Sequence, residues 1–330
     1  MRAFDYVRAY DLSTALHEGG RPETRFLAGG TTLLDLMKCG VERPARIVDI
    51  TRLSGLSDIE VDENSIRIGG LARMSHVADD PGVKAVAPAV SEALWRAASA
   101  QLRNMAAIGG NLMQRTRCSY FRDPVAYPDC NKRQPGSGCA AMAGVNRNHA
   151  VLGTSNACIA IYPGDLGVSL VAFDARIHIE GSRKRVVSAE EFFYLPGDRP
   201  DIENDLAPGE IIVGIEIPVS AALRRSHYLK ARDRASYEFA AASAAVGLEL
   251  APDGKTIREA RVALGGVATR PWRARTVEQA LAGQPLQEST FREASALAVE
   301  GAVSRGHNAY KITLAPKVVA RALMVAGGLT

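Results

Sequence analysis

Residues 25–38, RFLAGGTTLLDLMK, run from a short apolar stretch through a Gly-Gly-Thr-Thr turn into leucines at helical spacing. A strand, a glycine turn and a helix start leave backbone N–H groups free at the positive end of a helix, where an anion such as a pyrophosphate can bind. The turn matches neither the G-x-G-x-x-G fingerprint nor a Walker loop, and many such connections carry two glycines without a ligand. The stretch therefore predicts an α/β beginning and a candidate anion site at residues 29–32.

Short strands and helices continue along the chain, so its fold class is predicted to be α+β. Residues 238–250 fit either a strand or an Ala-rich helix, and a boundary near residues 221–225 divides the chain into parts 1–223 and 224–330. The alternating stretch 210–218 ends on a proline, as an outer strand can. The expected strands are residues 47–50, 65–68, 168–173, 210–218, 228–231 and 261–265, and the expected helices are residues 83–106 (interrupted at Pro88), 276–283, 290–304 and 314–326.

Composition is that of an ordinary globular protein: of 330 residues, 47% are hydrophobic and 23% are charged. No apolar run is long enough to predict a membrane span, and the N-terminus lacks a secretory signal. The net charge is +4, and residues 101–150 alone hold seven basic against two acidic side chains. The basic excess is thus one segment, and a globally basic nucleic-acid binder is not indicated.

Four of the five cysteines lie in an irregular, Pro- and Gly-rich loop at residues 113–160, and the fifth is Cys39. The loop sequence is Cys118-x11-Cys130-x8-Cys139-x18-Cys158, with none of the short C-x2-4-C knuckles typical of zinc sites. Four thiolates at long, uneven spacing suit an iron–sulfur cube, whose negative charge nearby cations and backbone N–H groups would offset. Zinc, two disulfides and four free thiols remain the alternatives.

Two further motifs suggest ligand contacts, and none suggests catalysis by this chain. A second Gly-Gly turn, IGGNL at residues 108–112, follows a predicted helix, and Asp165 comes just after the cysteine loop. The sequence has no G-x-S-x-G motif, and its six histidines form no metal-binding spacing. We therefore expect no catalytic residue in this chain.

Taken together, these motifs resemble the FAD-binding subunit of the molybdenum hydroxylases, the family of xanthine dehydrogenase, aldehyde oxidoreductase and carbon monoxide dehydrogenase. The resemblance covers the whole chain in order. The residues that carry it are FLAGGTT at 26–32 with Lys38, RN at 103–104 with IGGNL at 108–112, PGDL at 163–166 and LGGVATRP at 264–271. It implies a PCMH-type FAD-binding domain of two α/β subdomains, residues 1–223, followed by a small C-terminal domain of sheet and helices, residues 224–330.

One branch of that family carries an extra loop at the same place. The segment from RCSYFRD at 117–123 to AVLGT at 150–154 is similar to the loop of the periplasmic aldehyde oxidoreductase FAD subunit, where four cysteines hold a 4Fe–4S cluster. Hydroxybenzoyl-CoA reductases also have a cluster-bearing insertion. The resemblance thus implies a 4Fe–4S cluster on Cys118, Cys130, Cys139 and Cys158.

The same resemblance implies a set of FAD contacts. Ala106 and Ala107 stand where some relatives have Ser or Thr, so a hydroxyl contact is lost there, and Gly164 replaces a serine found in many members. Neither departure implies loss of FAD. The implied FAD contacts are Phe26, Leu27, Ala28, Gly29, Gly30, Thr31, Thr32, Leu33, Ala107, Gly110, Asn111, Asp165, Ile212 and Lys230.

The resemblance also implies an activity, which is electron transfer within a heterotrimer. A large molybdenum-cofactor subunit would oxidise an aldehyde to a carboxylic acid with water, and a small subunit with 2Fe–2S clusters would pass the electrons to this chain's FAD. A ferredoxin-like external acceptor would take them from there. A partner's twin-arginine signal would export the complex to the periplasm; otherwise it stays in the cytoplasm.

Several alternatives remain. The chain resembles subunits of xanthine dehydrogenases and hydroxybenzoyl-CoA reductases as well. A stand-alone flavin oxidase would need its own substrate base, and a zinc module binding RNA through the loop would carry no flavin.

Overall fold

The structure is a computed structural model that describes residues 1–329. Its N-terminal subdomain is a parallel sheet in the order β1-β3-β2, formed by β1 (Asp5–Arg8), β2 (Thr24–Leu27) and β3 (Arg46–Asp49). Helix α1 (Leu12–Gly19) connects β1 to β2, and α2 (Leu33–Lys38) follows the Gly-Gly turn, as residues 25–38 predict. The glycine turn therefore lies at the carboxyl end of a parallel strand, where α/β folds commonly bind ligands.

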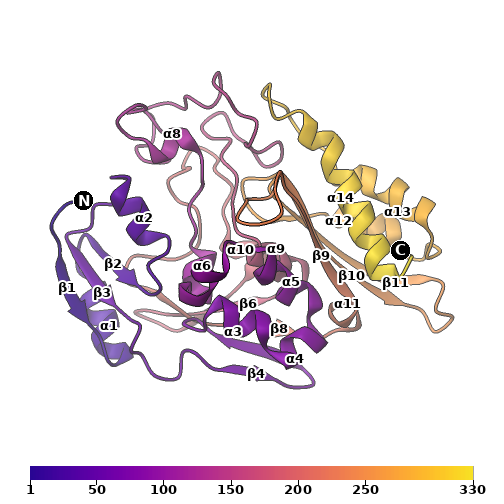
Figure 1. Cartoon of the computed structure of the whole chain (residues 1–330), viewed down its shortest axis with the longest axis horizontal. Coiled ribbons are helices and arrows are strands. Elements are labelled where there is room, and N and C mark those ends of the chain that lie inside the picture. The colour runs from indigo at the N-terminus through magenta and orange to yellow at the C-terminus, as the bar shows by residue number, and fades with distance from the viewer. Residues whose placement is uncertain (330) are drawn as a thin grey trace.

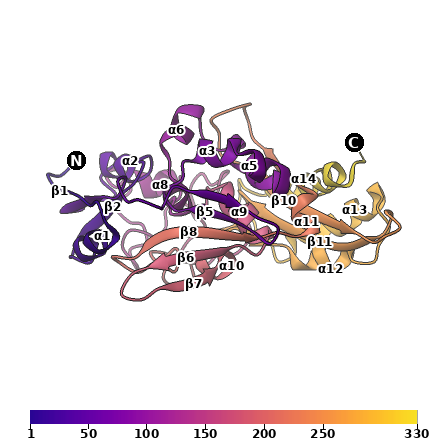
Figure 2. The same ribbon diagram turned by 90° about the horizontal axis from the view of Figure 1, so that it is seen from below.

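The second subdomain is an antiparallel sheet in the order β4-β5-β8-β6-β7 (Figure 2). The stretch expected as an outer strand is β8, which lies in the centre of this sheet; its proline is tolerated because it is the last residue of the strand. The strands are β4 (Ile59–Val61), β5 (Ser65–Gly69), β6 (Arg176–Glu180), β7 (Arg185–Ser188) and β8 (Ile211–Pro218).

Two sequence predictions are wrong in this subdomain. Residues 168–173 are not a strand but part of a helix whose residues are all buried, and periodicity cannot distinguish a fully buried helix from a buried strand. Residues 83–106 are interrupted at Pro88, as expected, but they break a second time, where Ser99 caps a third helix. The helices here are α3 (Met74–Asp79), α4 (Pro81–Val86), α5 (Pro88–Arg96), α6 (Ala100–Met105), α7 (Ile108–Leu112), α9 (Leu166–Ala172) and α10 (Ala189–Phe192).

The C-terminal part is an antiparallel sheet in the order β12-β11-β10-β9, with the long helix α14 packed on it (Figure 1). The ambiguous residues 238–250 contain a strand, β10. The helix expected at 290–304 ends at Ser295 and continues as a short 3-10 turn, η1 (Ala296–Val299). The elements are α11 (Ala221–Arg224), β9 (Ser226–Ala231), β10 (Ala242–Leu250), β11 (Ile257–Gly265), β12 (Trp272–Arg273), α12 (Arg275–Leu281), α13 (Glu288–Ser295) and α14 (Tyr310–Gly327).

The cysteine loop lies over the rest of the chain at the top of Figure 1, with α8 (Ser119–Arg122) as its one described helix. Two asparagines attach the loop to the C-terminal part: Asn146 donates to Arg305 O over 2.7 Å, and Asn308 donates to Ala150 O over 2.8 Å. No helix within residues 1–329 is both long and apolar enough to span a membrane. The fold confirms the predicted α+β class, and the expected division at residue 223 stays a prediction.

Candidate functional site

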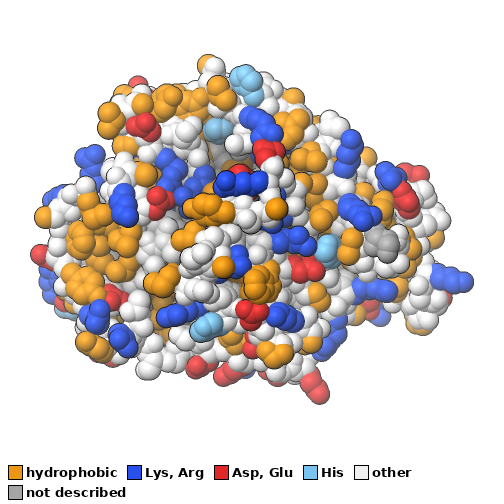
Figure 3. All heavy atoms as spheres, in the orientation of Figure 1, with side chains coloured by type: hydrophobic (Ala, Val, Ile, Leu, Met, Phe, Trp, Pro, Cys, Tyr) orange, Lys and Arg blue, Asp and Glu red, His pale blue; other side chains and the backbone are white. Residues whose placement is uncertain are grey.

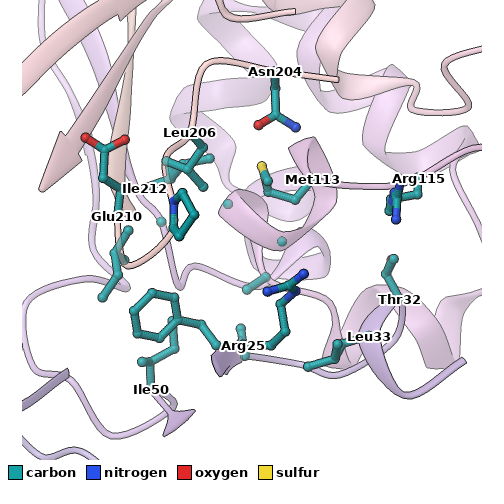
Figure 4. A pocket seen from close by; sticks show the side chains of 18 of the residues that line it. Arg25, Thr32, Leu33, Ile50, Met113, Arg115, Asn204, Leu206, Glu210 and Ile212 are labelled. Carbon is teal, nitrogen blue, oxygen red and sulfur yellow. The ribbon is translucent and has the colours of Figure 1, made fainter. Parts of the chain in front are cut away.

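A cavity of about 750 Å³ opens between the N-terminal subdomain and the segment of residues 201–212 that leads into β8. Figure 4 shows Arg25, Thr32 and Leu33 on one side of this cavity and Asn204, Leu206 and Ile212 on the other. Its volume is in the range of pockets that hold cofactor-sized ligands. The cavity is therefore the candidate site for the predicted cofactor.

The glycine turn forms one wall of the cavity with its backbone. A Cβ on Gly29 would stand 1.9 Å from Met105 O, so only glycine allows the turn to pack against the end of α6. Gly30 adopts φ +71°, a conformation that glycine reaches without strain. The backbone N–H groups of residues 29–31 donate to no other backbone carbonyl within residues 1–329, which leaves them available to an anionic ligand.

Two arginines that the sequence reasoning missed contribute charge to the same cavity. Arg25 Nε lies 3.2 Å from Glu42 Oε2, and Glu42 Oε1 lies 2.9 Å from Arg115 Nη1. Arg115 Nε also lies 2.7 Å from Glu203 Oε1, and Arg115 donates to Lys132 O. This ionic chain crosses the cavity wall from β2 to the segment of residues 201–212. No sequence motif reveals this ionic chain, because the residues that form it are far apart in the sequence.

Most of the predicted FAD contacts line the cavity, whereas four do not. Those that line it are Phe26, Ala28, Gly29, Gly30, Thr31, Thr32, Leu33, Ala107, Gly110 and Ile212. Those that do not are Leu27, Asn111, Asp165 and Lys230. The assignment of all fourteen residues as FAD contacts stays a prediction.

Asp165 and Lys230 pair with each other instead of facing the cavity. Lys230 Nζ lies 2.9 Å from Asp165 Oδ2 and donates to Arg96 O, and the Tyr228 hydroxyl donates to Asp165 Oδ1 over 2.6 Å. Burial raises the pKa of Tyr228 well above its usual range, which keeps that hydroxyl a donor. The three side chains connect the start of α9 to β9 and so fix the C-terminal part against the second subdomain.

Asn111 is buried, and only the nitrogen of its side-chain amide has a hydrogen-bond partner within the described residues. Its Nδ2 lies 3.3 Å from Met74 Sδ, and its Oδ1 has no hydrogen-bond partner within the described residues. A buried carbonyl oxygen without a donor is costly, so a ligand that supplied one would bind favourably here. Asn111 lies on α7, one residue after the cavity-lining Gly110.

The cysteine loop brings its four thiols into one region. The backbones of Cys130 and Cys139 pair in an isolated antiparallel β-bridge. The pKa values of Cys118, Cys139 and Cys158 are each raised in part by the charge of another thiol of the loop. All four are free, and no three His, Cys, Asp or Glu side chains in residues 1–329 are close enough to hold one metal ion. This arrangement does not favour a single zinc ion.

Burial raises the pKa of the Cys118 thiol to about 12 and also raises the pKa values of Cys139 and Cys158. Backbone N–H groups act against this rise: those of Phe121 and Tyr120 at Cys118, and that of Ala160, which lies 3.4 Å from Cys158 Sγ. Buried thiols ringed by amide donors remain protonated without a metal and suit thiolate ligation once a metal displaces the protons.

Most basic side chains of the cysteine loop attach the loop to other parts of the chain through ion pairs. Figure 3 shows Lys and Arg side chains on this face with acidic side chains among them. Five of the seven basic side chains in residues 101–150 form ion pairs with carboxylates outside that segment. Arg115 pairs with Glu42 and Glu203, Arg117 and Arg122 with Asp35, Lys132 with Glu203, and Arg147 with Asp233. The interpretation of this basic excess as the surroundings of an anionic cluster stays a prediction, and the charge of Lys132 does act against the rise in the pKa of the Cys158 thiol.

Two known family descriptions match this chain. The description "FAD binding domain in molybdopterin dehydrogenase" matches residues 2–220, and "CO dehydrogenase flavoprotein C-terminal domain" matches residues 226–326. This chain is an FAD-binding subunit of the molybdenum hydroxylase family. The family assignment and the FAD-binding domain confirm the resemblance seen in the sequence.

The relatives of this FAD subunit are oxidoreductases. The chain is 42% identical to the aldehyde oxidoreductase FAD-binding subunit PaoB of Escherichia coli K12, over 98% of both chains. It is 29% identical to the glyceraldehyde dehydrogenase medium chain of Sulfolobus acidocaldarius, over 88% of this chain and 85% of that one. Its fold is similar to that of CO dehydrogenase from Oligotropha carboxidovorans, with a TM-score of 0.77 at 22% identity over 100% of this chain and 99% of that one.

Proposed function

We propose that this FAD subunit transfers electrons within a heterotrimeric, molybdenum-dependent aldehyde oxidoreductase. The observation that carries the proposal is the whole-length identity of 42% to an aldehyde oxidoreductase FAD-binding subunit. The partners are a large subunit with the molybdenum cofactor and a small subunit with 2Fe–2S clusters. The overall reaction converts an aldehyde and water into a carboxylic acid, two protons and two electrons, and this chain handles only the electrons.

FAD fits the cavity because the glycine turn and the cavity size match a dinucleotide. The N–H groups at Gly29 and Gly30 would bind the pyrophosphate, while Arg25 and Arg115, which both pair with Glu42, would hold the cavity wall in place. Residues 201–212 would cover the cofactor and exclude water. When bound, FAD would take electrons one at a time from the 2Fe–2S clusters and hold up to two of them, while the chain supplies its position and electrostatics.

The four cysteines would hold a 4Fe–4S cluster. The chemistry of the donor set supports this assignment: four free thiols, two of them buried and two partly buried, near one another and beside backbone N–H groups. The loop that carries Cys118, Cys130, Cys139 and Cys158 also supplies Arg115 and Lys132 to the ionic chain of the FAD cavity. The cluster would thus lie next to the cofactor, with a ferredoxin-like protein as the external electron acceptor.

The compartment is part of the same proposal. A complex assembled in the cytoplasm, where thiols stay reduced, would be exported folded to the periplasm by a partner's twin-arginine signal. Fractionation of cells followed by immunodetection of this chain tests that step. Detection of this chain only in the cytoplasm would contradict the periplasmic assignment, and the assignment of the cofactors would be unaffected.

Purification of the native complex tests the function. We expect two co-purifying subunits, molybdenum, and, on the separated chain, one FAD with about four irons and matching acid-labile sulfide. The complex should oxidise aldehydes faster than purines, and it should not reduce aromatic acyl-CoA thioesters. One zinc and no flavin on this chain, or aldehyde oxidation by the chain alone, would overturn the proposal.

A further inference from the structure

One imidazole touches the cysteine site. His149 Nε2 lies 3.2 Å from Cys118 Sγ, and the side chain is buried within the loop. The backbone N–H of His149 donates to Asn146 O, whose own side chain is held by Arg305 O, so the ring has little freedom. Its Nδ1 has no hydrogen-bond partner within the described residues. The sulfur contact is therefore the one polar interaction that orients this ring.

A buried ammonium from another part of the chain lies near the same imidazole. Lys311, at the start of α14, is fully buried and donates to Gly266 O over 2.5 Å. No carboxylate in residues 1–329 forms an ion pair with it, whereas its neighbour Arg147 is paired with Asp233. Asn308, three residues before Lys311, donates to Ala150 O over 2.8 Å, and the Arg147 guanidinium lies 4.9 Å from the centre of the Tyr310 ring, so the start of α14 packs against the loop on both sides of His149. A buried, unpaired cation is costly unless an anion is bound nearby.

The anion that would balance the Lys311 charge is the proposed 4Fe–4S cluster. A cube with four thiolates carries net negative charge, and it gains a further negative charge when it is reduced. Carboxylates pair with four of the five arginines of the loop, which reduces the charge that these four can supply to a cluster. His149 and Lys311 are two buried polar groups near this region that have no acidic partner within the described residues.

We propose that His149 Nε2–H donates a hydrogen bond to the Cys118 thiolate and that Lys311 supplies the compensating positive charge, so that both residues raise the reduction potential of the cluster. The inference rests on the proposed 4Fe–4S cluster. A metal-bound thiolate only accepts hydrogen bonds, which places the proton on Nε2. Both residues are positioning residues, because they act on the cluster through charge and hydrogen bonding and not as ligands.

Redox titration of the complex, followed by the electron paramagnetic resonance of the reduced cluster, tests the proposal. Loss of a hydrogen bond to a charged sulfur is expected to change the equilibrium between oxidised and reduced cluster roughly tenfold, or about 59 mV for one electron. His149→Ala and Lys311→Met should both shift the cluster midpoint to more negative potential. His149→Gln retains an N–H donor and should stay near the wild-type value.

Controls separate this inference from general damage and from failure of the proposed function. His178→Ala changes a histidine that pairs with Glu216 in the second subdomain, and Lys84→Met changes an exposed lysine; neither should shift the midpoint. A wild-type chain without iron would contradict the proposed cluster itself. A wild-type chain with a cluster whose midpoint is the same in His149→Ala and Lys311→Met would overturn the inference alone. Loss of the cluster in His149→Gln as well as in His149→Ala would also overturn it, because donation would then not be the role of the ring.

Discussion

Gly110 gives a test of the FAD site that leaves the fold intact. It lines the cavity, and a Cβ built on it would meet no atom within 4 Å. Gly110→Ala should therefore fold normally, while the added methyl group occupies space that FAD needs. We expect the dissociation constant for FAD to rise at least about tenfold, which is roughly 1.4 kcal/mol. Flavin fluorescence titration of the apoprotein measures this constant.

The matched control is Gly20→Ala. Gly20 has φ −72° and an ordinary contact distance of 3.4 Å for a new Cβ, and it lies outside the cavity. It should bind FAD as the wild type does. Equal FAD affinity in Gly110→Ala and wild type would place the cofactor elsewhere.

The pH dependence of stability should report the buried Lys311. Burial lowers its pKa from 10.5 to about 7 in the folded chain, so between these values the unfolded chain binds a proton that the folded chain has released. Stability should therefore rise with pH above 7, by at most roughly 1.4 kcal/mol per unit. The comparison is Lys311→Met against its parent, both in an iron-free background with all four loop cysteines changed to Ser.

Urea unfolding at several pH values between 7 and 9 measures the effect. The stability difference between the two proteins should change with pH in favour of the parent, because methionine cannot titrate. Parallel stability curves would mean that Lys311 keeps an ordinary pKa in the absence of the cluster.

At the level of single residues, local sequence revealed the turns but not the long-range pairs. Gly29 and Gly30 are recognisable because a strand and a helix flank them directly. The pairing of Asp165 with Lys230 joins residues 65 positions apart. The contact of His149 with Cys118 depends on how an irregular loop folds back on itself, and no periodic pattern encodes that path.

Arg115 joins the segment of residues 201–212 to the cysteine loop, which makes them a single cover of the proposed FAD cavity. Arg115→Ala would leave Glu42 and Glu203 facing the cavity without their shared cation. We expect weaker FAD binding, by about tenfold, since a hydrogen bond to a charged group is lost on each side. Stopped-flow measurement of FAD release should show that the dissociation rate accounts for most of the change.

Arg176→Ala is the control for this effect. Arg176 also pairs with a glutamate, but it is 60% exposed and lies on β6 away from the cavity. Exposed pairs contribute little, so its FAD release should match the wild type. An Arg115→Ala protein with unchanged release would show that the ionic chain does not hold the cover.

At the level of elements, predictions from the sequence succeeded where one face is exposed. Alternation identified β8, because its side chains differ between the two faces of the sheet. The pattern did not reveal that β8 is central, since sheet order depends on pairing partners far along the chain. Helix α9 was mistaken for a strand because burial on all sides removes the polar residues that mark helical periodicity.

One hydrophobic core extends from the second subdomain into the C-terminal part. It contains Ile68 and Leu94 from the former together with Tyr228, Ala245 and Ala263 from the latter. Two parts that share a core cannot unfold separately without exposing it to water. The two family domains of this chain should therefore behave as one cooperative unit, although their sequences match separate descriptions.

Thermal unfolding of the FAD-loaded chain tests this cooperativity. Far-ultraviolet circular dichroism and the fluorescence of released flavin should give the same midpoint. Tyr228 is fully buried, so Tyr228→Ala should reduce the free energy of unfolding by about 3–5 kcal/mol, as other truncations of large buried aromatic side chains do. Both midpoint temperatures should therefore fall together. Tyr237→Ala, which removes a ring that is 56% exposed, should leave them unchanged. If flavin release preceded the loss of secondary structure in Tyr228→Ala, the FAD site and the C-terminal sheet would be separate cooperative units, and the shared core would not couple them.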